Sequence, residues 1–282
     1  MMKNYGQRYT FAMLFWLTVF FVFPFLIILV GSFLKKGLYG GFEFEFSLAA
    51  YTSLFSGTMK KVTLNTLFVS VATTVLTVAM AIPSAYYIAR SPHKEKLLFL
   101  VIIPFWTNFL IRIFAWIAIL GNNGLVNSFL ISLGVFNAPV QLLYNRWAII
   151  LIMIYTSLPF AILPLYAIIE KFDFSLLEAA RDLGATKWQS VYKILIPLII
   201  PGITTAVLFT FIPAFGNFAI PDIVGGNDIR MLGNIINEKL KTARNWPAAS
   251  SISMVLTLIS VFMVLMFNRI TASRDSQQKT ET

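Results

Sequence analysis

Residues 175–197 read SLLEAARDLGATKWQSVYKILIP, a polar stretch that separates two long apolar runs. Ser175 and Glu178 have the spacing of a capping box, in which a hydroxyl accepts a hydrogen bond from the third helical amide and a carboxylate reaches back to the cap. Gly184 suits the position after a helix, because glycine readily adopts the left-handed conformation that ends one. Thr186 begins a second capping box with the glutamine three residues later. The stretch therefore predicts a helical hairpin, called here the 175–197 hairpin.

Small side chains mark one part of this hairpin. Ala179, Ala180 and Gly184 leave the first helix without bulk, so the surface of another protein could approach its backbone closely. From the residues alone the hairpin is either a docking element or an ordinary amphipathic connector, and both interpretations stay open.

The rest of the chain is organised around long apolar runs. About 20 helical residues are needed to cross the ~30 Å hydrocarbon layer of a membrane. The expected spans are 11–34, 64–89, 97–120, 147–169, 198–220 and 249–268. The first run is too long for the apolar region of a secretion signal and lacks an A-x-A cleavage pattern, so we expect a retained anchor. The sequence predicts an all-α integral membrane protein, with six transmembrane helices in a single domain over residues 1–282.

Composition supports this class and excludes others. Hydrophobic residues make up 58% of the chain, charged residues 12%, and the mean hydropathy is +0.78. Soluble proteins average about 25% charged residues. The net charge of +10 comes from Lys and Arg between the apolar runs, which indicates membrane-flanking anchors facing lipid headgroups and no nucleic-acid surface. The absence of cysteine excludes disulfides and thiolate metal sites.

The sequence indicates less strongly on which side of the membrane the termini lie. Six spans require both termini to lie on one side. If the N-terminus is cytoplasmic, the cytoplasmic segments contain slightly more Lys and Arg than the outer segments. We therefore expect cytoplasmic termini, with the 175–197 hairpin on the same face.

The hairpin resembles the EAA motif of ABC importer permeases, EAA-x3-G-x9-I-x-L-P. The matching residues are Glu178, Ala179, Ala180, Gly184, Ile194, Leu195, Ile196 and Pro197, with isoleucine at 196 in place of leucine. The resemblance implies the type I ABC importer permease fold, in a bacterial inner membrane. It further implies that a coupling helix containing Glu178, Ala179, Ala180, Asp182 and Gly184 docks on a cytoplasmic ATPase.

Further segments are similar to the first of the two permease subunits of spermidine/putrescine importers. They are Pro104–Asn108, Leu110–Arg112, Asn122–Gly124, Phe211–Ala214, Asp222 with Gly225-Gly226, and Asn245–Pro247. This resemblance implies a polyamine substrate. It also implies two copies of an ABC ATPase, a second six-span permease and an extracytoplasmic substrate-binding protein as partners.

A polyamine carries several ammonium groups, which bind carboxylates, carbonyls and aromatic faces. Asp222 ends the fifth apolar run, where an ionisable group is costly enough to suggest a function, although a salt bridge to Arg112 is an equal alternative. Trp106 could offer its ring face or pack in the core. Asn108 offers an amide oxygen, although hydrogen bonding between helices is the commoner use of such a residue. Glu238 lies in an outer loop, where it could meet substrate, meet the binding protein or be simply solvated.

Other motifs are missing from the sequence. There is no G-x-x-x-x-G-K-[ST] motif, so we expect a partner to bind ATP and Mg²⁺ and no cofactor in this chain. His93 is the single histidine, which excludes an H-E-x-x-H metal site. The glycine pairs at 40–41 and 225–226 are interpreted as turns. The alternatives are an ABC permease for thiamine, an iron complex or an oxyanion, or a secondary transporter, for which we see no internal repeat.

Overall fold

The computed structural model describes residues 10–11, 13–226 and 229–280. Both chain ends, whose side of the membrane was predicted above, lie outside these residues. The contacts within the chain group it into two compact units, and the single permease domain stays a prediction. The first unit comprises residues 1–63 and 232–259, and the second comprises residues 64–231 and 260–282.

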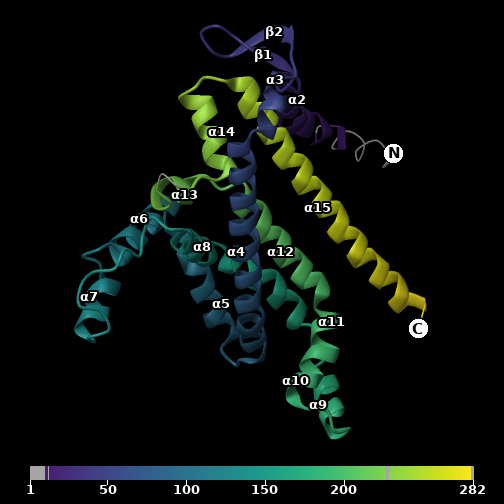
Figure 1. The fold of residues 1–282 in the computed structure, drawn as a ribbon. Coiled ribbons are helices and arrows are strands. Elements are labelled where there is room, and N and C mark those ends of the chain that lie inside the picture. The colour runs from purple at the N-terminus through teal and green to yellow at the C-terminus, as the bar shows by residue number, and fades with distance from the viewer. Residues whose placement is uncertain (1–9, 12, 227–228, 281–282) are drawn as a thin grey trace. The chain divides into compact units, whose positions relative to one another are not determined.

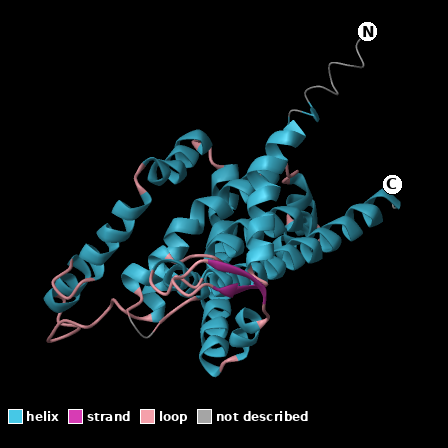
Figure 2. Ribbon diagram, turned by 90° about the horizontal axis from the view of Figure 1, so that it is seen from above, coloured by secondary structure: helices cyan, strands magenta, loops and turns pink. Residues whose placement is uncertain are grey.

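The first unit combines helices with one short hairpin. Its elements are α2 (Phe23–Gly31), β1 (Leu34–Lys36), β2 (Phe42–Phe46), α3 (Ala49–Thr52), α14 (Leu232–Lys241) and the first part of α15 (Trp246–Thr280). The hairpin, magenta in Figure 2, was missed by the all-α expectation. The glycine pair at its turn was predicted correctly, with φ of 99° at Gly40 and 79° at Gly41.

The second unit is helical throughout its described residues. Its elements are α4 (Gly57–Arg90, from residue 64), α5 (Lys94–Ile102), α6 (Phe109–Leu120), α7 (Leu125–Ser132), α8 (Arg146–Ile169), α9 (Ser175–Asp182), α10 (Lys187–Ser190), α11 (Ile196–Leu198), α12 (Ile200–Phe215) and α13 (Ala219–Val224). In Figure 1, α9 and α10 lie beyond the α11 end of α12.

Helices long and apolar enough to cross a membrane agree with a multi-span protein. Within the described residues these are Met13–Gly31, Gly57–Arg90, Phe109–Ser132, Arg146–Ile169 and Trp246–Phe267. A sixth consists of Lys187–Leu198 and Ile200–Phe215, which meet at a bend of 70°. The described residues thus hold five or six candidate spans.

The third expected span, 97–120, is not one helix. α5 ends at Ile102, a 3-10 turn covers Ile103–Trp106, and α6 begins at Phe109. Pro104 cannot donate a helical hydrogen bond. Asn108 then starts a new helix, because its side-chain oxygen accepts a hydrogen bond from the Leu110 amide at 2.8 Å. The expected single span is therefore two helices separated at the proline.

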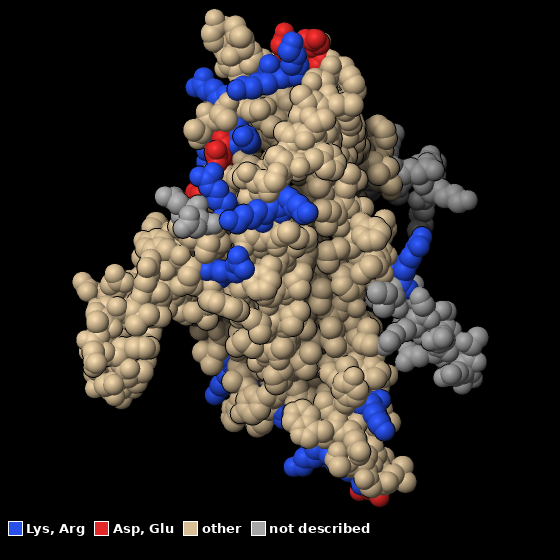
Figure 3. Space-filling model, in the orientation of Figure 1, with Lys and Arg blue, Asp and Glu red and all other residues tan. Residues whose placement is uncertain are grey.

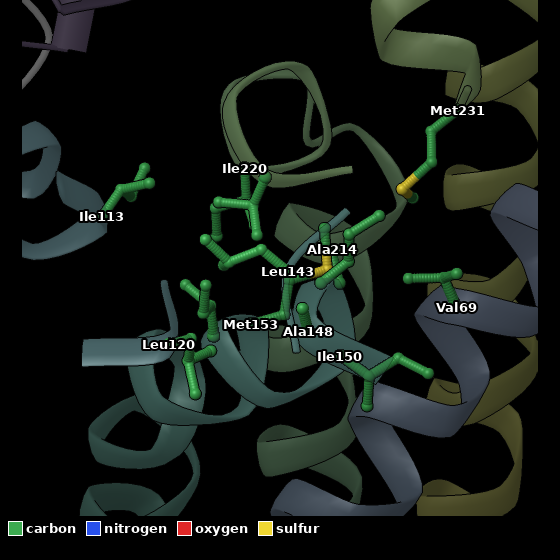
Figure 4. Packing of buried hydrophobic residues seen from close by; sticks show 13 residues of the cluster. Val69, Ile113, Leu120, Leu143, Ala148, Ile150, Met153, Ala214, Ile220 and Met231 are labelled. Carbon is green, nitrogen blue, oxygen red and sulfur yellow. The ribbon is translucent and has the colours of Figure 1, made fainter. Parts of the chain in front are cut away.

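The core of the second unit lies around α8. One buried cluster joins α4, α6, α8, α12 and α13, and Figure 4 shows Val69, Ile150, Met153 and Ala214 within it. A second buried cluster contains Ala85, Ile88, Leu165, Ile169, Leu177, Leu195 and Ile199. It extends from α4 and α8 to the hairpin, so α9 is packed against the same core as the membrane helices.

Candidate functional site

The turn of the 175–197 hairpin has the predicted geometry. Gly184 has φ of 90°, its amide donates to the Arg181 carbonyl at 2.9 Å, and the Ala185 amide donates to the Ala180 carbonyl at 3.0 Å. These two bonds form a Schellman motif, which ends a helix at a left-handed residue. An added Cβ at Gly184 would meet no atom within 4 Å, so the glycine is required by backbone conformation and not by space.

The two predicted capping boxes differ in outcome. The second is confirmed, since the Gln189 amide donates to Thr186 Oγ1 at 3.2 Å and the Thr186 amide donates to Gln189 Oε1 at 2.9 Å. The first is wrong. Ser175 is already helical, and its amide donates to Asp173 Oδ1 at 3.0 Å. Hydrogen bonds from the hydroxyl and the amide of Ser175 lower the pKa of the Asp173 carboxyl. These hydrogen bonds stabilise the ionised carboxylate more than the protonated carboxyl, which explains the shift.

The outer surface of the hairpin forms a candidate docking face. Glu178, Ala179, Asp182 and Gly184 are exposed and Ala180 is partly buried. Three large side chains of the same stretch that we did not predict are also exposed, namely Leu183, Trp188 and Tyr192. Apolar groups gathered on the surface mark protein contacts. The sequence signal that could have predicted them is the presence of these large residues in an otherwise polar stretch. In Figure 3 charged residues lie at this end of the second unit.

One side chain fixes α9 to the body of the unit. Leu177 is 1% exposed and is the buried residue of this helix. It belongs to the cluster that contains Ile88 of α4 and Ile169 of α8. The docking face therefore lies opposite a single apolar anchor.

An aromatic clamp holds the start of α9 against the end of α4. The ring of Phe174 meets that of Tyr86 edge-on, with 5.9 Å between centroids. The Arg90 guanidinium lies 5.3 Å from the Phe174 centroid, and its Nη1 donates to the Tyr86 hydroxyl at 3.0 Å. Cation–π contact of this kind is favourable at partly exposed sites. Tyr86, Arg90 and Phe174 are called the clamp below.

An ion pair joins the adjacent segments. Lys94 Nζ, at the start of α5, lies 2.7 Å from Glu170 Oε1, at the end of α8. The hydrogen bond to Glu170 raises the pKa of Lys94. Hydrogen bonds from Lys94 and Tyr166 lower the pKa of Glu170. Clamp and ion pair together connect the hairpin to the turn between α4 and α5.

The predicted substrate-path residues of the second unit lie on two segments. Trp106 is 77% exposed and its ring meets Phe99 edge-on at 5.8 Å, so burial in the core of this chain is excluded. Asn108 caps α6 and does not join two helices. Asp222 is exposed on α13, a helix that packs against α6.

Arg112 is not the salt-bridge partner of Asp222. Its guanidinium lies 5.8 Å from the Phe109 ring centroid, and its Nε is buried without a hydrogen-bond partner in the described structure. Ion pairs of the described residues involve Lys35 and Lys94 and do not include Arg112. Glu238 is partly buried on α14 and belongs to the first unit.

Comparison with known proteins defines the family. Residues 48–270 match the family described as "Binding-protein-dependent transport system inner membrane component". The spermidine/putrescine transport system permease protein PotB of Haemophilus influenzae is 38% identical over 95% of this chain and 94% of its own length. PotB of Escherichia coli is 39% identical over 94% of this chain and 97% of its own.

A solved structure confirms the fold. A bacterial ABC transporter involved in the import of alginate matches with a TM-score of 0.74 at 19% identity, covering 95% of this chain and 96% of the other. A second structure of an alginate ABC transporter, in complex with a periplasmic protein, matches with a TM-score of 0.70 at 20% identity, covering 94% of this chain and 93% of the other. The chain therefore belongs to the binding-protein-dependent transport system inner membrane components, and it is a multi-pass permease of an ABC importer that is not itself an ATPase.

Proposed function

We propose that this permease imports polyamines, spermidine or putrescine, that a binding protein delivers from outside. The observation that carries the proposal is the 38% identity to a spermidine/putrescine permease over 95% of the chain. The exposed Asp222 carboxylate and Trp106 ring are chemically suited to the substrate, since one attracts an ammonium group and the other offers a π face.

The proposed path begins where the binding protein releases the polyamine. Asp222 pairs with one ammonium group and Trp106 covers an adjacent part of the chain, while Asn108 and Glu238 offer further oxygen acceptors. Losing the hydration of an ammonium group is expensive, and a carboxylate partner offsets that cost. The packing of α13 against α6 supports a common role for Asp222 and the segment around Trp106.

Coupling is proposed to occur at the opposite face of the membrane. One of two ATPase copies docks on Glu178, Ala179, Ala180, Asp182 and Gly184, with Leu183 and Trp188 as apolar contacts. A second six-span permease forms the other half of the path. ATP and Mg²⁺ are bound by the ATPase, and the whole chain acts as one permease domain with the 175–197 hairpin inside.

Topology can be tested by cysteine labelling. Asn227 would be a natural outer position, but it lies outside the described residues, so Tyr39 in the exposed hairpin turn is preferable. Thr186→Cys and Tyr39→Cys should react with an impermeant maleimide from opposite sides of the membrane. Reaction of both from one side would contradict cytoplasmic termini and the inner position of the hairpin.

Substrate can be tested in proteoliposomes that contain the assembled importer. We expect ATP-dependent uptake of labelled spermidine or putrescine, with thiamine, sulfate and ferric citrate unable to compete. Uptake of one of these other solutes would replace the polyamine assignment. Uptake that persists without ATP would contradict an ATP-driven mechanism.

A further inference from the structure

The strand hairpin formed by β1 and β2 in the first unit has an irregular register. Its pairs are Leu34 with Phe46, Lys35 with Glu43, and Lys36 with Phe42. Two residues of β2, Phe44 and Glu45, are therefore left without a partner in β1 and form a bulge. Bulges bend a strand and re-aim side chains. Phe44 is consequently 93% exposed, although the FEFEF sequence of β2 places it in line with two other phenylalanines.

Those two phenylalanines anchor the hairpin. The Phe42 ring meets Trp246 edge-on at 5.5 Å, and it covers Gly31 so closely that an added Cβ there would lie 2.5 Å from the ring. The Phe46 ring stacks on Phe33 at 6.1 Å. Phe44 thus lies between Phe42, which is packed, and Phe46, which keeps one ring contact although it is 71% exposed. Such preorganisation lowers the entropic cost of binding.

Charged residues flank Phe44 in β2, and both pair with a lysine of β1. Lys35 Nζ lies 2.7 Å from Glu45 Oε2 and 4.0 Å from Glu43 Oε2. Figure 3 shows blue and red residues together at the tip that Figure 1 labels β1 and β2. Burying a phenylalanine stabilises a fold, so exposing one in a fixed position forgoes that stabilisation. An aromatic centre with a charged rim is the composition of a protein-interface anchor.

We propose that this bulged hairpin is a docking surface for the extracytoplasmic substrate-binding protein, with Phe44 as its anchor. The inference rests on the proposed function and topology, in which the loop between the first two spans faces outside. The family requires such a partner. The chemistry expected of it is an apolar socket for the ring, rimmed by groups that donate hydrogen bonds to Glu43 and Glu45. Immersion in lipid is disfavoured because Lys35 and both carboxylates would enter the membrane with the ring.

The test uses the complete importer in nanodiscs. Its probe is the purified, spermidine-loaded binding protein encoded with this permease, and its dissociation constant is measured with wild type, Phe44→Ala and Phe44→Leu. The matched control is Phe55→Ala, because Phe55 is also 88% exposed in the first unit but lies outside the hairpin. We expect Phe44→Ala to weaken binding about 30-fold. Phe44→Leu should lose less, and Phe55→Ala should bind as wild type.

Each outcome has a distinct meaning. At saturating binding protein, Phe44→Ala should reach the wild-type ATPase rate, because only docking has been weakened. Unchanged affinity in Phe44→Ala would overturn the docking surface and leave the proposed function intact. A blue shift of Phe44→Trp fluorescence in phosphatidylethanolamine–phosphatidylglycerol vesicles, in the absence of binding protein, would assign the ring to the membrane and overturn it as well. If wild type itself does not bind, the proposed function fails first.

Discussion

Replacing Leu177 by alanine should loosen the coupling helix without changing its docking face. Leu177 is 1% exposed, and α9 has no other buried side chain. Truncation of a fully buried leucine costs about 2–5 kcal/mol, from lost transfer free energy and the cavity that remains. Because the anchor serves α9 alone, this loss should fall on its attachment to the body of the second unit. The opening equilibrium of α9 should rise about 30-fold at the lower limit.

The assay combines hydrogen exchange with transport. Amide exchange over Ser175–Asp182 should accelerate in the assembled importer, and ATP hydrolysed per polyamine imported should increase. Leu176→Ala is the control, because Leu176 is 45% exposed and a surface truncation changes stability by about 0.5 kcal/mol. Wild-type exchange and coupling in Leu177→Ala, with assembly intact, would refute the reasoning that burial of Leu177 holds α9 to the body of the second unit.

Three further predictions concern the hairpin, the ion pair and the path. Gly184→Ala should cost about 1–2 kcal/mol of stability of the 175–197 hairpin because position 184 has a positive φ, and Gly184→Asn should cost less. Gly184→Trp should also insert normally but uncouple uptake from ATP hydrolysis. Equal melting temperatures for the three variants would contradict the difference in stability. The Lys94–Glu170 pair should stabilise the α8–α9 connection at pH values above the ordinary Glu pKa of 4.5 and below the ordinary Lys pKa of 10.5. This stabilisation should be lost as the pH falls through the lowered folded pKa of Glu170 or rises through the raised folded pKa of Lys94. The difference in amide exchange between wild type and Glu170→Gln should therefore stay constant from about pH 5 to 10, and its disappearance near neutrality would exclude the pair as its source. Asp222→Asn should assemble normally and lose uptake, and adding Arg112→Gln should restore nothing; normal uptake in Asp222→Asn would remove Asp222 from the path.

Local sequence determined the parts of the hairpin that were predicted correctly. Gly184 and the Thr186 box depend on residues within three or four positions of each other, so their geometry follows from spacing. The prediction of the first capping box was wrong because the acceptor of the Ser175 amide is Asp173, which precedes the box. The clamp was not predictable, because Tyr86 and Phe174 meet only after α4 and α8 have packed.

The spans show the same division between local and tertiary information. Apolar length predicted that helices would form but not where they would break. The break at Pro104 is followed by a new helix that Asn108 caps. The strand hairpin was missed although its phenylalanines and glutamates alternate over residues 42–46, as in a half-exposed strand. Its bulge, which exposes Phe44, depends on anchors at Phe33 and Trp246 that the local sequence does not indicate.

The contacts of the second unit supply a continuous route from the docking face to the segment around Trp106. The clamp and the Lys94–Glu170 pair attach the hairpin to the turn that begins α5. α5 is a short helix that ends at the Pro104 break, so a shift at its start can be carried to Trp106 without deforming a full span. A pocket of about 400 Å³ lies between α4, α5 and α8, and Pro104 lines it. The exchange experiment on Leu177→Ala tests this route too, because α5 should become less protected together with α9 if the two helices move as one.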